Sequence, residues 1–178
     1  AKVVADYAGV PVINAGDGSH EHPTQTLCDL YTIKKERQTL KGLKIALWGD
    51  LKHGRTIHSL TYALARFGAT IHLRSSPGLE MPEHVKRKLA TEYTGRLERF
   101  ADLGNIVGKK HFPLDAIYIT PTSPHQLAMM PDISLEVELD KGVDALYVTR
   151  LQRERLSTAE EAQGLKTSYP VVDKQLLK

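Results

Sequence analysis

The sequence has a single cysteine, Cys28, and no long apolar run. One cysteine excludes a disulfide within the chain and is typical of a reducing compartment, so we expect the cytoplasm. Inside a helix, Cys28 is expected to be a small buried hydrophobic residue and not a nucleophile. A membrane span needs roughly 18 or more consecutive apolar residues, so we expect none. The first residues, AKVVADYAGVPVIN, also lack the features of a signal peptide.

Aromatic residues and net charge are scarce as well. Aromatics make up 6% of the residues, and 24 Lys and Arg stand against 21 Asp and Glu, which gives a net charge of +3. Nucleic-acid binding is typically accompanied by a basic stripe and stacking aromatics, so we expect no nucleic-acid partner. Small anionic substrates remain compatible with this charge. With 178 residues, 41% of them hydrophobic, the chain can form one domain with a sizeable core.

Short β-rich runs alternate with amphipathic helical stretches along the chain. The β-rich runs predict strands over 10–15, 43–50, 69–75, 114–120 and 143–149. Helical periodicity predicts helices from Pro23 to about Arg37, over 56–68 and over 81–93. In the first of these helices, the apolar positions that predict the buried face are 27, 30, 31 and 33.

Strands and helices in alternation with short connections are typical of a parallel sheet covered by helices. We therefore expect an α/β fold that is doubly wound, with a mainly parallel sheet and helices on both faces. Ligands of such folds bind outside the carboxyl ends of the strands. The segments that follow the strands are therefore the candidates for a site: GDGSHEH, GDLKHGR, TPTSPHQ and TRLQRER.

The segment HEHPTQ places two histidines just before the helix that begins at Pro23. A metal site is one interpretation, but no HExxH motif or Cys/His cluster accompanies His20 and His22, so we assign no metal ligand. A helix start is the other interpretation, since proline is favoured in the first turn. The free N–H groups of a helix start attract anions. The helix start can thus form part of a site, with His22 and Gln25 beside it.

Arginines follow two further predicted strands. In GDLKHGRT, Arg55 can bind a carboxylate through two hydrogen bonds, and an ordinary strand-to-helix turn is the alternative. The segment matches neither G-x-G-x-x-G nor G-x-x-x-x-G-K-[ST], the two glycine-rich nucleotide-binding patterns. In TRLQRER, Arg150 and Gln152 point to one side of an extended segment, and Arg153 begins a charged stretch that is expected to be solvated. These residues together suit an anionic substrate.

Three motifs resemble the catalytic chains of the aspartate carbamoyltransferase family: PVINAGDGSHEHPTQTLCDLYTI, GDLKHGRTIHSL and DALYVTRLQRERL. That family transfers the carbamoyl group of carbamoyl phosphate to the α-amine of L-aspartate. The products are N-carbamoyl-L-aspartate, a precursor in pyrimidine biosynthesis, and phosphate. Ornithine carbamoyltransferases differ in the second and third motifs, because ornithine has no second carboxylate. The resemblance implies an enzyme that needs no metal and no organic cofactor.

The resemblance also implies roles for individual residues. His22 would donate a hydrogen bond to the carbonyl oxygen of carbamoyl phosphate, and Gln25 would hold the carbamoyl amide. Arg55 and Arg150, together with Gln152, would fix the carboxylates of aspartate, and His22 and Arg55 would be the catalytic residues. The amine would attack the carbonyl carbon to form a tetrahedral intermediate, from which phosphate leaves. The protein would orient the substrates and stabilise developing oxyanion charge.

The resemblance divides the chain into two parts. Residues 1–40 would be the strand, site loop and linking helix of a preceding carbamoyl-phosphate domain that is incomplete here. Residues 41–178 would be the aspartate-binding domain, with an incomplete C-terminal part and an insertion near 102–135. If this insertion covers the site, His125 and Gln126 lie near the substrate.

Further expectations concern assembly. Arg155 matches a family position associated with domain closure. The family forms homotrimers through the N-terminal domain, whose phosphate loop is absent here, and a regulatory or dihydroorotase partner is compatible with the resemblance. Without that loop the chain is expected to bind carbamoyl phosphate poorly. A non-catalytic carbamoyltransferase-like domain that acts as an assembly or interaction module is the alternative, and a nucleotide-binding α/β module is a third hypothesis.

Overall fold

The computed structural model describes residues 1–18, 20–93, 100–102, 114–120 and 143–149. Within these ranges it contains one sheet of five strands in the order β3-β2-β1-β4-β5. The strands are β1 (Lys44–Trp48), β2 (Thr70–Arg74), β3 (Phe100–Asp102), β4 (Ala116–Ile119) and β5 (Ala145–Val148). Every neighbouring pair is parallel. This is the strand order of doubly wound Rossmann-type folds, so the predicted α/β class is confirmed.

The sheet is buried because its strands are apolar on both faces. In β1, Ile45 and Leu47 join a core cluster with the helices, whereas Ala46 joins a second cluster with Ile117 and Ile119 of β4 on the opposite face. Successive side chains of a strand point to opposite faces, which explains this division. A strand that is buried on both sides reads as a continuous hydrophobic run, and this is why KIALW could be recognised from its sequence.

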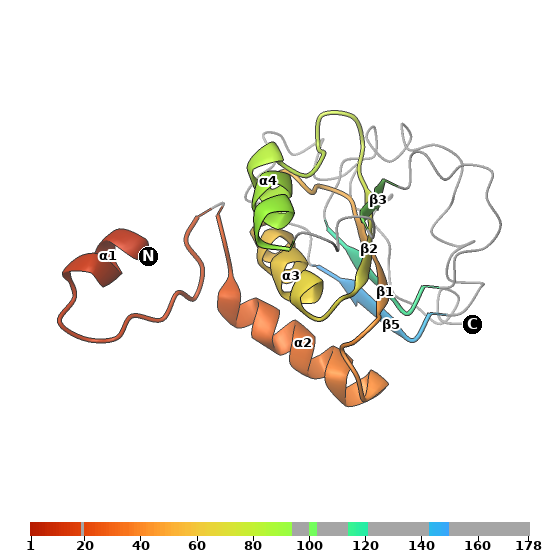
Figure 1. Cartoon of the computed structure of the whole chain (residues 1–178), viewed down its shortest axis with the longest axis horizontal. Helices are drawn as coiled ribbons and strands as arrows, with labels where there is room; N and C mark the ends of the chain where they lie inside the picture. The colour runs from red at the N-terminus through yellow and green to blue at the C-terminus, as the bar shows by residue number, and fades with distance from the viewer. Residues whose placement is uncertain (19, 94–99, 103–113, 121–142, 150–178) are drawn as a thin grey trace, which may run out of the picture.

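Three helices cover the face of the first cluster, and Figure 1 shows them on one side of the sheet. They are α2 (Pro23–Arg37), α3 (Arg55–Arg66) and α4 (Glu83–Glu92). Leu60 and Leu64 of α3 and Leu89 of α4 are buried against the strands. The expectation of helices on the other face concerns residues outside the described ranges. Among the described residues, no helix is long and apolar enough to cross a bilayer.

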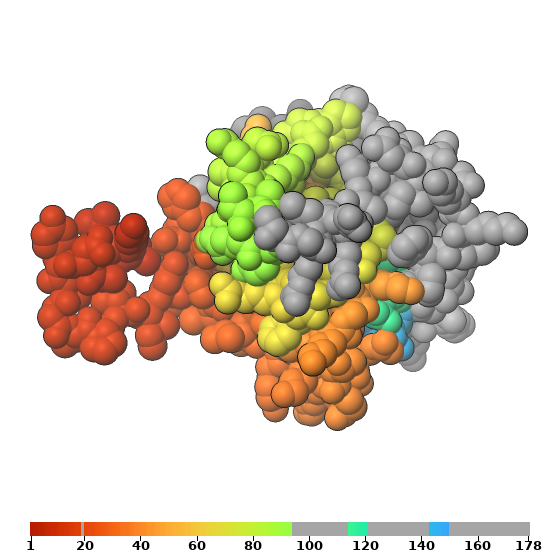
Figure 2. All heavy atoms as spheres, viewed as in Figure 1, coloured from red at the N-terminus to blue at the C-terminus, as the bar shows by residue number. Residues whose placement is uncertain are grey.

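The predicted strand at 10–15 is wrong. These residues form neither helix nor strand, and they follow a short helix, α1 (Lys2–Tyr7), which the sequence analysis missed. Val10 and Ile13 are 71% and 81% exposed. Figures 1 and 2 show this N-terminal segment projecting from the rest of the molecule. A strand needs a hydrogen-bonded neighbour, and within the described part of the chain this segment has none.

The buried face of α2 also differs from the prediction. Its buried residues are Thr26, Asp29, Leu30 and Ile33, which follow the helical spacing of three and four. Leu27 and Tyr31 are exposed, and so is Cys28, which we had expected to be buried. The prediction followed apolar residues alone, whereas the buried face of the helix includes the polar residues Thr26 and Asp29.

Candidate active site

His22 caps the start of α2 with its own ring. The backbone N–H of Gln25 donates to Nδ1 of His22 at 3.2 Å, and Pro23 occupies the first helical position. Proline costs little there, because its missing N–H would have no partner within the helix. A neutral imidazole whose Nδ1 accepts carries its proton on Nε2. His22 therefore offers an Nε2–H donor at the start of a helix.

Helix α3 anchors the same residue. The backbone N–H of His22 donates to Oγ of Ser59 at 2.9 Å. Gly16, with φ +123°, lies between His22 and Arg55, and a Cβ at this position would be 3.3 Å from Nη1 of Arg55 and 3.3 Å from Cδ2 of His22. Only glycine adopts this conformation readily and leaves room here. The two predicted site residues thus border the same glycine.

Arg55 is the first residue of α3, where a cation opposes the helix dipole. Its Nη1 donates to the carbonyl oxygen of Gly18 at 3.1 Å, which uses one of five N–H donors. Among the described residues, no carboxylate pairs with it. Neither α2 nor α3 has an acidic residue in its first turn. Two helix starts and a guanidinium therefore create positive potential that suits an anionic ligand.

Gln25 is held by two oxygen atoms from different elements. Its Nε2 donates to Oδ1 of Asp29 at 2.9 Å and to the hydroxyl oxygen of Tyr147, in β5, at 3.2 Å. Both amide protons are therefore engaged, and Oε1 remains to accept from a ligand. Asp29 is 5% exposed. Burial raises the pKa of its carboxyl group, and the hydrogen bond from Gln25 opposes this effect, as does His22 when its ring is protonated.

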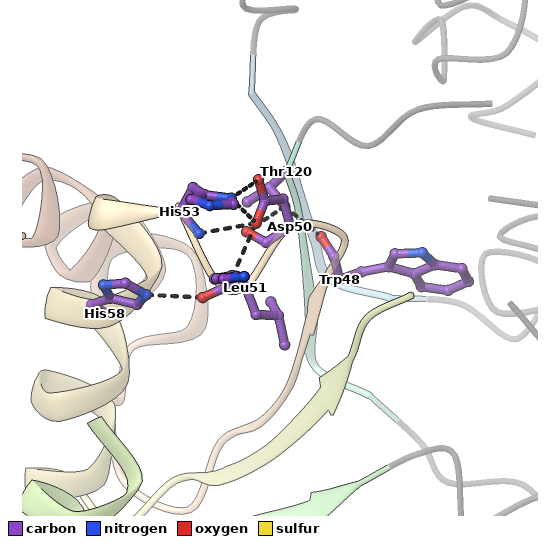
Figure 3. A network of polar contacts seen from close by, with 7 residues as sticks. Trp48, Asp50, Leu51, His53, His58 and Thr120 are labelled. Atoms are coloured by element: carbon purple, nitrogen blue, oxygen red, sulfur yellow. Dashed lines mark hydrogen bonds and ion pairs between the residues drawn. The ribbon is translucent and has the colours of Figure 1, made fainter. Parts of the chain in front are cut away.

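The turn between β1 and α3 is fixed by its own hydrogen bonds (Figure 3). The carboxylate of Asp50 accepts from the backbone N–H groups of Lys52 and His53, and Nδ1 of His53 lies 3.0 Å from its Oδ2. His58 donates through Nε2 to the carbonyl oxygen of Leu51 at 2.8 Å. The ring of His53 therefore contributes to the turn, and the turn fixes the position at which α3 begins.

Gly49 makes the same turn possible. Its φ is +111°, and a Cβ there would lie 2.5 Å from the carbonyl oxygen of Thr120. The Thr120 hydroxyl donates to the carbonyl oxygen of Trp48 at 3.1 Å. The backbone N–H of Gly49 donates to the carbonyl oxygen of Arg74 at 2.9 Å. Hydrogen bonds thus connect the ends of β1, β2 and β4 at the turn that leads into α3.

Glu21, beside His22, reaches helix α4. Its carboxylate lies 3.7 Å from Nζ of Lys88, and that ammonium group lies 4.1 Å from the ring centroid of Tyr62 in α3. Burial, with the charge of Glu21 second, raises the pKa of Tyr62 to about 12. The side chains of Lys88 and Glu21 are 43% and 38% exposed, and an ion pair in contact with solvent contributes little to stability, so this pair orients the loop more than it stabilises the fold.

An open hollow of about 630 Å³ lies next to these residues. Its lining includes His20, His53, His84 and Lys52, together with Glu80. His22, Gln25 and Arg55 do not line it. In the described ranges, no three His, Cys, Asp or Glu side chains are placed to hold a metal ion.

The structure thus brings together three of the predicted site residues, His22, Gln25 and Arg55. His20 is exposed, and its Nδ1 lies 3.2 Å from the carbonyl oxygen of Asp17, away from this group. The other predicted residues lie outside the described ranges: Arg150, Gln152, Arg155, His125 and Gln126.

Sequence reasoning missed three residues that hold the site together. Asp29 stands four positions after Gln25, a spacing at which Gln and Asp meet on a helix, so this contact could have been found. Ser59 lies 37 residues from His22, and Tyr147 lies 122 residues from Gln25. No local pattern relates those pairs.

Comparison with known proteins gives consistent matches. Residues 1–35 match the family described as "Aspartate/ornithine carbamoyltransferase, carbamoyl-P binding domain". The aspartate carbamoyltransferase catalytic subunit of Methanopyrus kandleri is 44% identical over 171 residues, which is 96% of this chain and 44% of that protein. The catalytic subunit of Thermococcus kodakarensis is 41% identical, with the same coverage of 96% and 44%.

Solved structures give the same assignment. The catalytic subunit of M. jannaschii aspartate transcarbamoylase aligns with a TM-score of 0.56 and 35% identity, over 96% of this chain and 45% of that one. The Trypanosoma cruzi enzyme in complex with carbamoyl aspartate and phosphate aligns with a TM-score of 0.65 and 29% identity, over 90% of this chain and 53% of that one.

The present chain spans less than half the length of the curated relatives that it matches. Within that span the likeness is nearly continuous, and it includes the helix start, the glycine-rich turn and the parallel sheet described above. The chain belongs to the aspartate carbamoyltransferase family.

Proposed function

We propose that this chain carries part of an active site that transfers the carbamoyl group of carbamoyl phosphate to the α-amine of L-aspartate. The observation that carries the proposal is the ring of His22. Its Nδ1 caps α2, so its Nε2–H is available as a donor beside Arg55. The Trypanosoma cruzi neighbour has been solved in complex with carbamoyl phosphate and aspartate, which supports this choice of substrates.

In this proposal the start of α2 binds the carbamoyl group. Nε2–H of His22 donates to the carbonyl oxygen, and Oε1 of Gln25 accepts from the carbamoyl NH₂. The positive end of the helix dipole adds to this polarisation. Negative charge grows on the carbonyl oxygen as the amine attacks, so a donor fixed in advance is worth more in the transition state than in the ground state.

Aspartate binds through its two carboxylates. Arg55 donates to one carbonyl oxygen within the protein and has further N–H donors for a carboxylate. Arg150 and Gln152, which lie outside the described ranges, complete the carboxylate contacts by family likeness, and Arg155 acts in domain closure. The neutral amine forms the new C–N bond, the C–O bond to phosphate breaks, and a phosphate oxygen takes the amine proton.

The domain division and the assembly belong to the same proposal. Residues 1–40 form the end of a carbamoyl-phosphate domain, consistent with the match to that domain over 1–35. Residues 41–178 form the aspartate domain, with the insertion near 102–135. We expect a homotrimer, and a regulatory or dihydroorotase partner remains compatible with the family.

The test is the formation of N-carbamoyl-L-aspartate from carbamoyl phosphate and aspartate by a purified protein in which residues 1–178 are joined to a complete carbamoyl-phosphate domain. Ornithine is the control amine, and a Leu27→Ala variant, changed at an exposed position of α2, is the control protein. We expect product with aspartate and none with ornithine, and loss of product in His22→Ala. For a preparation without turnover, the melting temperature is measured with aspartate plus phosphate. The absence of both product and a ligand-induced rise in melting temperature would favour the non-catalytic interaction module.

A further inference from the structure

Asp29 is a buried acid with an unusual environment. Its side chain is 5% exposed, Oδ1 accepts from Gln25, and Oδ2 has no hydrogen-bond partner among the described residues. Burying such a group is unfavourable, so its place on the inner face of α2 needs a reason. An apolar residue at this position would pack against the same strands without that cost.

The second observation is a cavity of about 150 Å³ between α2 and the strands. It is lined by Asp29 and Ile33 of α2 and by Tyr118 and Tyr147 of the neighbouring strands. The two tyrosine rings are stacked, with centroids 4.2 Å apart and an angle of 11° between their planes. The Tyr118 hydroxyl donates to Oγ1 of Thr56 in α3 at 3.1 Å. The Tyr147 ring, which supports Gln25, is therefore itself supported.

An amide side chain can turn by 180° and exchange its oxygen and nitrogen atoms at almost no change in shape. Fixed neighbours decide which end faces outward. A carboxylate can only accept hydrogen bonds, whereas a tyrosine hydroxyl can donate or accept. Of the two groups that contact Nε2 of Gln25, Asp29 is therefore the one that excludes the turned amide.

We propose that Asp29 is a positioning residue: by accepting from Nε2 of Gln25 it turns Oε1 toward the ligand and so selects a ligand that presents an N–H donor. This inference rests on the proposed function, in which that donor is the carbamoyl NH₂. Asp29 itself does not contact substrate. A site built to bond an N–H group rejects an analogue that lacks it, because the site's own acceptor is then left without a partner.

The matched pair of substrates is carbamoyl phosphate and acetyl phosphate, which differ in NH₂ against CH₃ on the carbonyl carbon. The measured quantity is the ratio of kcat/KM for the two substrates, with aspartate as acceptor. Asp29→Asn keeps the shape of the Asp29 side chain and permits the Gln25 amide to turn. We therefore expect the preference for carbamoyl phosphate to fall about tenfold, which corresponds to the free energy of roughly one hydrogen bond. The KM for aspartate should stay unchanged.

Two further variants separate positioning from general loosening. Ile33→Val, on the same buried face, shortens a side chain that lines the same cavity and should leave the ratio unchanged. In a Gln25→Ala background, Asp29→Asn should have no further effect, since residues that act through each other are not additive. An unchanged ratio in Asp29→Asn, or an additive loss in the double variant, would overturn the proposal.

A ligand-free measurement distinguishes this inference from the proposed function. The side-chain amide protons of Gln25 should give two well-separated NMR signals with slow solvent exchange, and Asp29→Asn should shift them and speed the exchange. If wild-type protein transfers neither group and the NMR change is seen, the proposed function fails and the positioning of Gln25 stands. If the signals are the same in both proteins, the positioning itself is refuted.

Discussion

The polar residues at the two ends of helix α2 serve different purposes. At the C-terminal end, Arg37 donates through Nη2 to Asp115 at 2.7 Å and through Nη1 to Asp144 at 2.6 Å. Asp115 also accepts from the backbone N–H of Lys44 at 2.8 Å. These acids directly precede β4 and β5, so the helix end is fastened to the sheet. At its start, His22 and Gln25 keep atoms available to a ligand.

The difference between Arg37 and Arg55 teaches how a site arginine can be told from a structural one. Arg37 stands in the last turn of a helix, where a cation is favourable, and two carboxylates occupy its guanidinium group. Arg55 stands in a first turn, where a cation is unfavourable, and a single carbonyl oxygen occupies it. Unused donors in an unfavourable position indicate a ligand more clearly than residue type does.

The sharpest test of this comparison is His22→Ala. Loss of an oxyanion donor should lower kcat about 10²- to 10³-fold, and loss of the helix cap should cost about 1 kcal/mol of folding stability. Steady-state kinetics and chemical denaturation measure the two effects. If kcat stays within a factor of a few while stability falls, His22 is a cap and nothing more.

Next come the matched changes Arg55→Lys and Arg37→Lys. Lysine keeps the charge but cannot form paired hydrogen bonds to a carboxylate. We expect Arg55→Lys to raise the KM for aspartate about tenfold or more, with little change in melting temperature. Arg37→Lys should lower the melting temperature and leave the KM unchanged. The reverse pattern would contradict the division between a ligand-binding arginine at the start of α3 and a structural arginine at the end of α2.

A third change, Asp115→Ala, weakens the attachment of the C-terminal end of α2 to the sheet. It removes the ion pair with Arg37 and the acceptor for Lys44, so unfolding should become easier by about 1–3 kcal/mol. The Asp115 carboxylate contacts the end of α2 opposite to His22. We therefore expect kcat/KM for carbamoyl phosphate to change little at a temperature where the protein stays folded. A large loss of activity in the folded variant would mean that the two ends are coupled through α2.

The smallest effect concerns pH. Burial holds the pKa of Asp29 above its ordinary value of 3.8. Between that value and the raised pKa, the folded protein binds more protons than the unfolded chain, so stability from this group is lost as the pH rises. Asp29→Asn should therefore show a shallower fall in unfolding free energy from pH 4 upward. Parallel curves for the two proteins would show that Asp29 titrates alike in both states.

Much of the fold was predictable because its elements have local signatures. Every residue of KIALW after Lys44 is apolar, and Gly68 follows the helix that ends at Arg66. The segment at 10–15 misled because apolar residues indicate a strand only when a neighbour exists to pair with them. The three-residue strand β3 is too short to carry a period of two.

The site was predictable only in part, and for a related reason. His22, Gln25 and Arg55 stand at the ends of elements, where the local sequence shows both the helix start and the polar residue. The support of Gln25 by Tyr147 depends on β5 pairing with β4, a contact between distant residues that the sequence pattern does not encode. The roles of Arg150 and Gln152 rest on family likeness and stay predictions.

The fastening of α2 has a consequence for how the chain is cut by proteases. The helix is tied to α3 through Ser59 at its start and to the sheet through Arg37 at its end, so it moves with the sheet as one body. For residues 1–15 the structure shows no such ties to the helices or the sheet that it describes: α1 has no buried residue, and Val10 and Ile13 are exposed. Limited digestion should therefore remove the first fifteen or so residues early and leave His22 on the larger fragment.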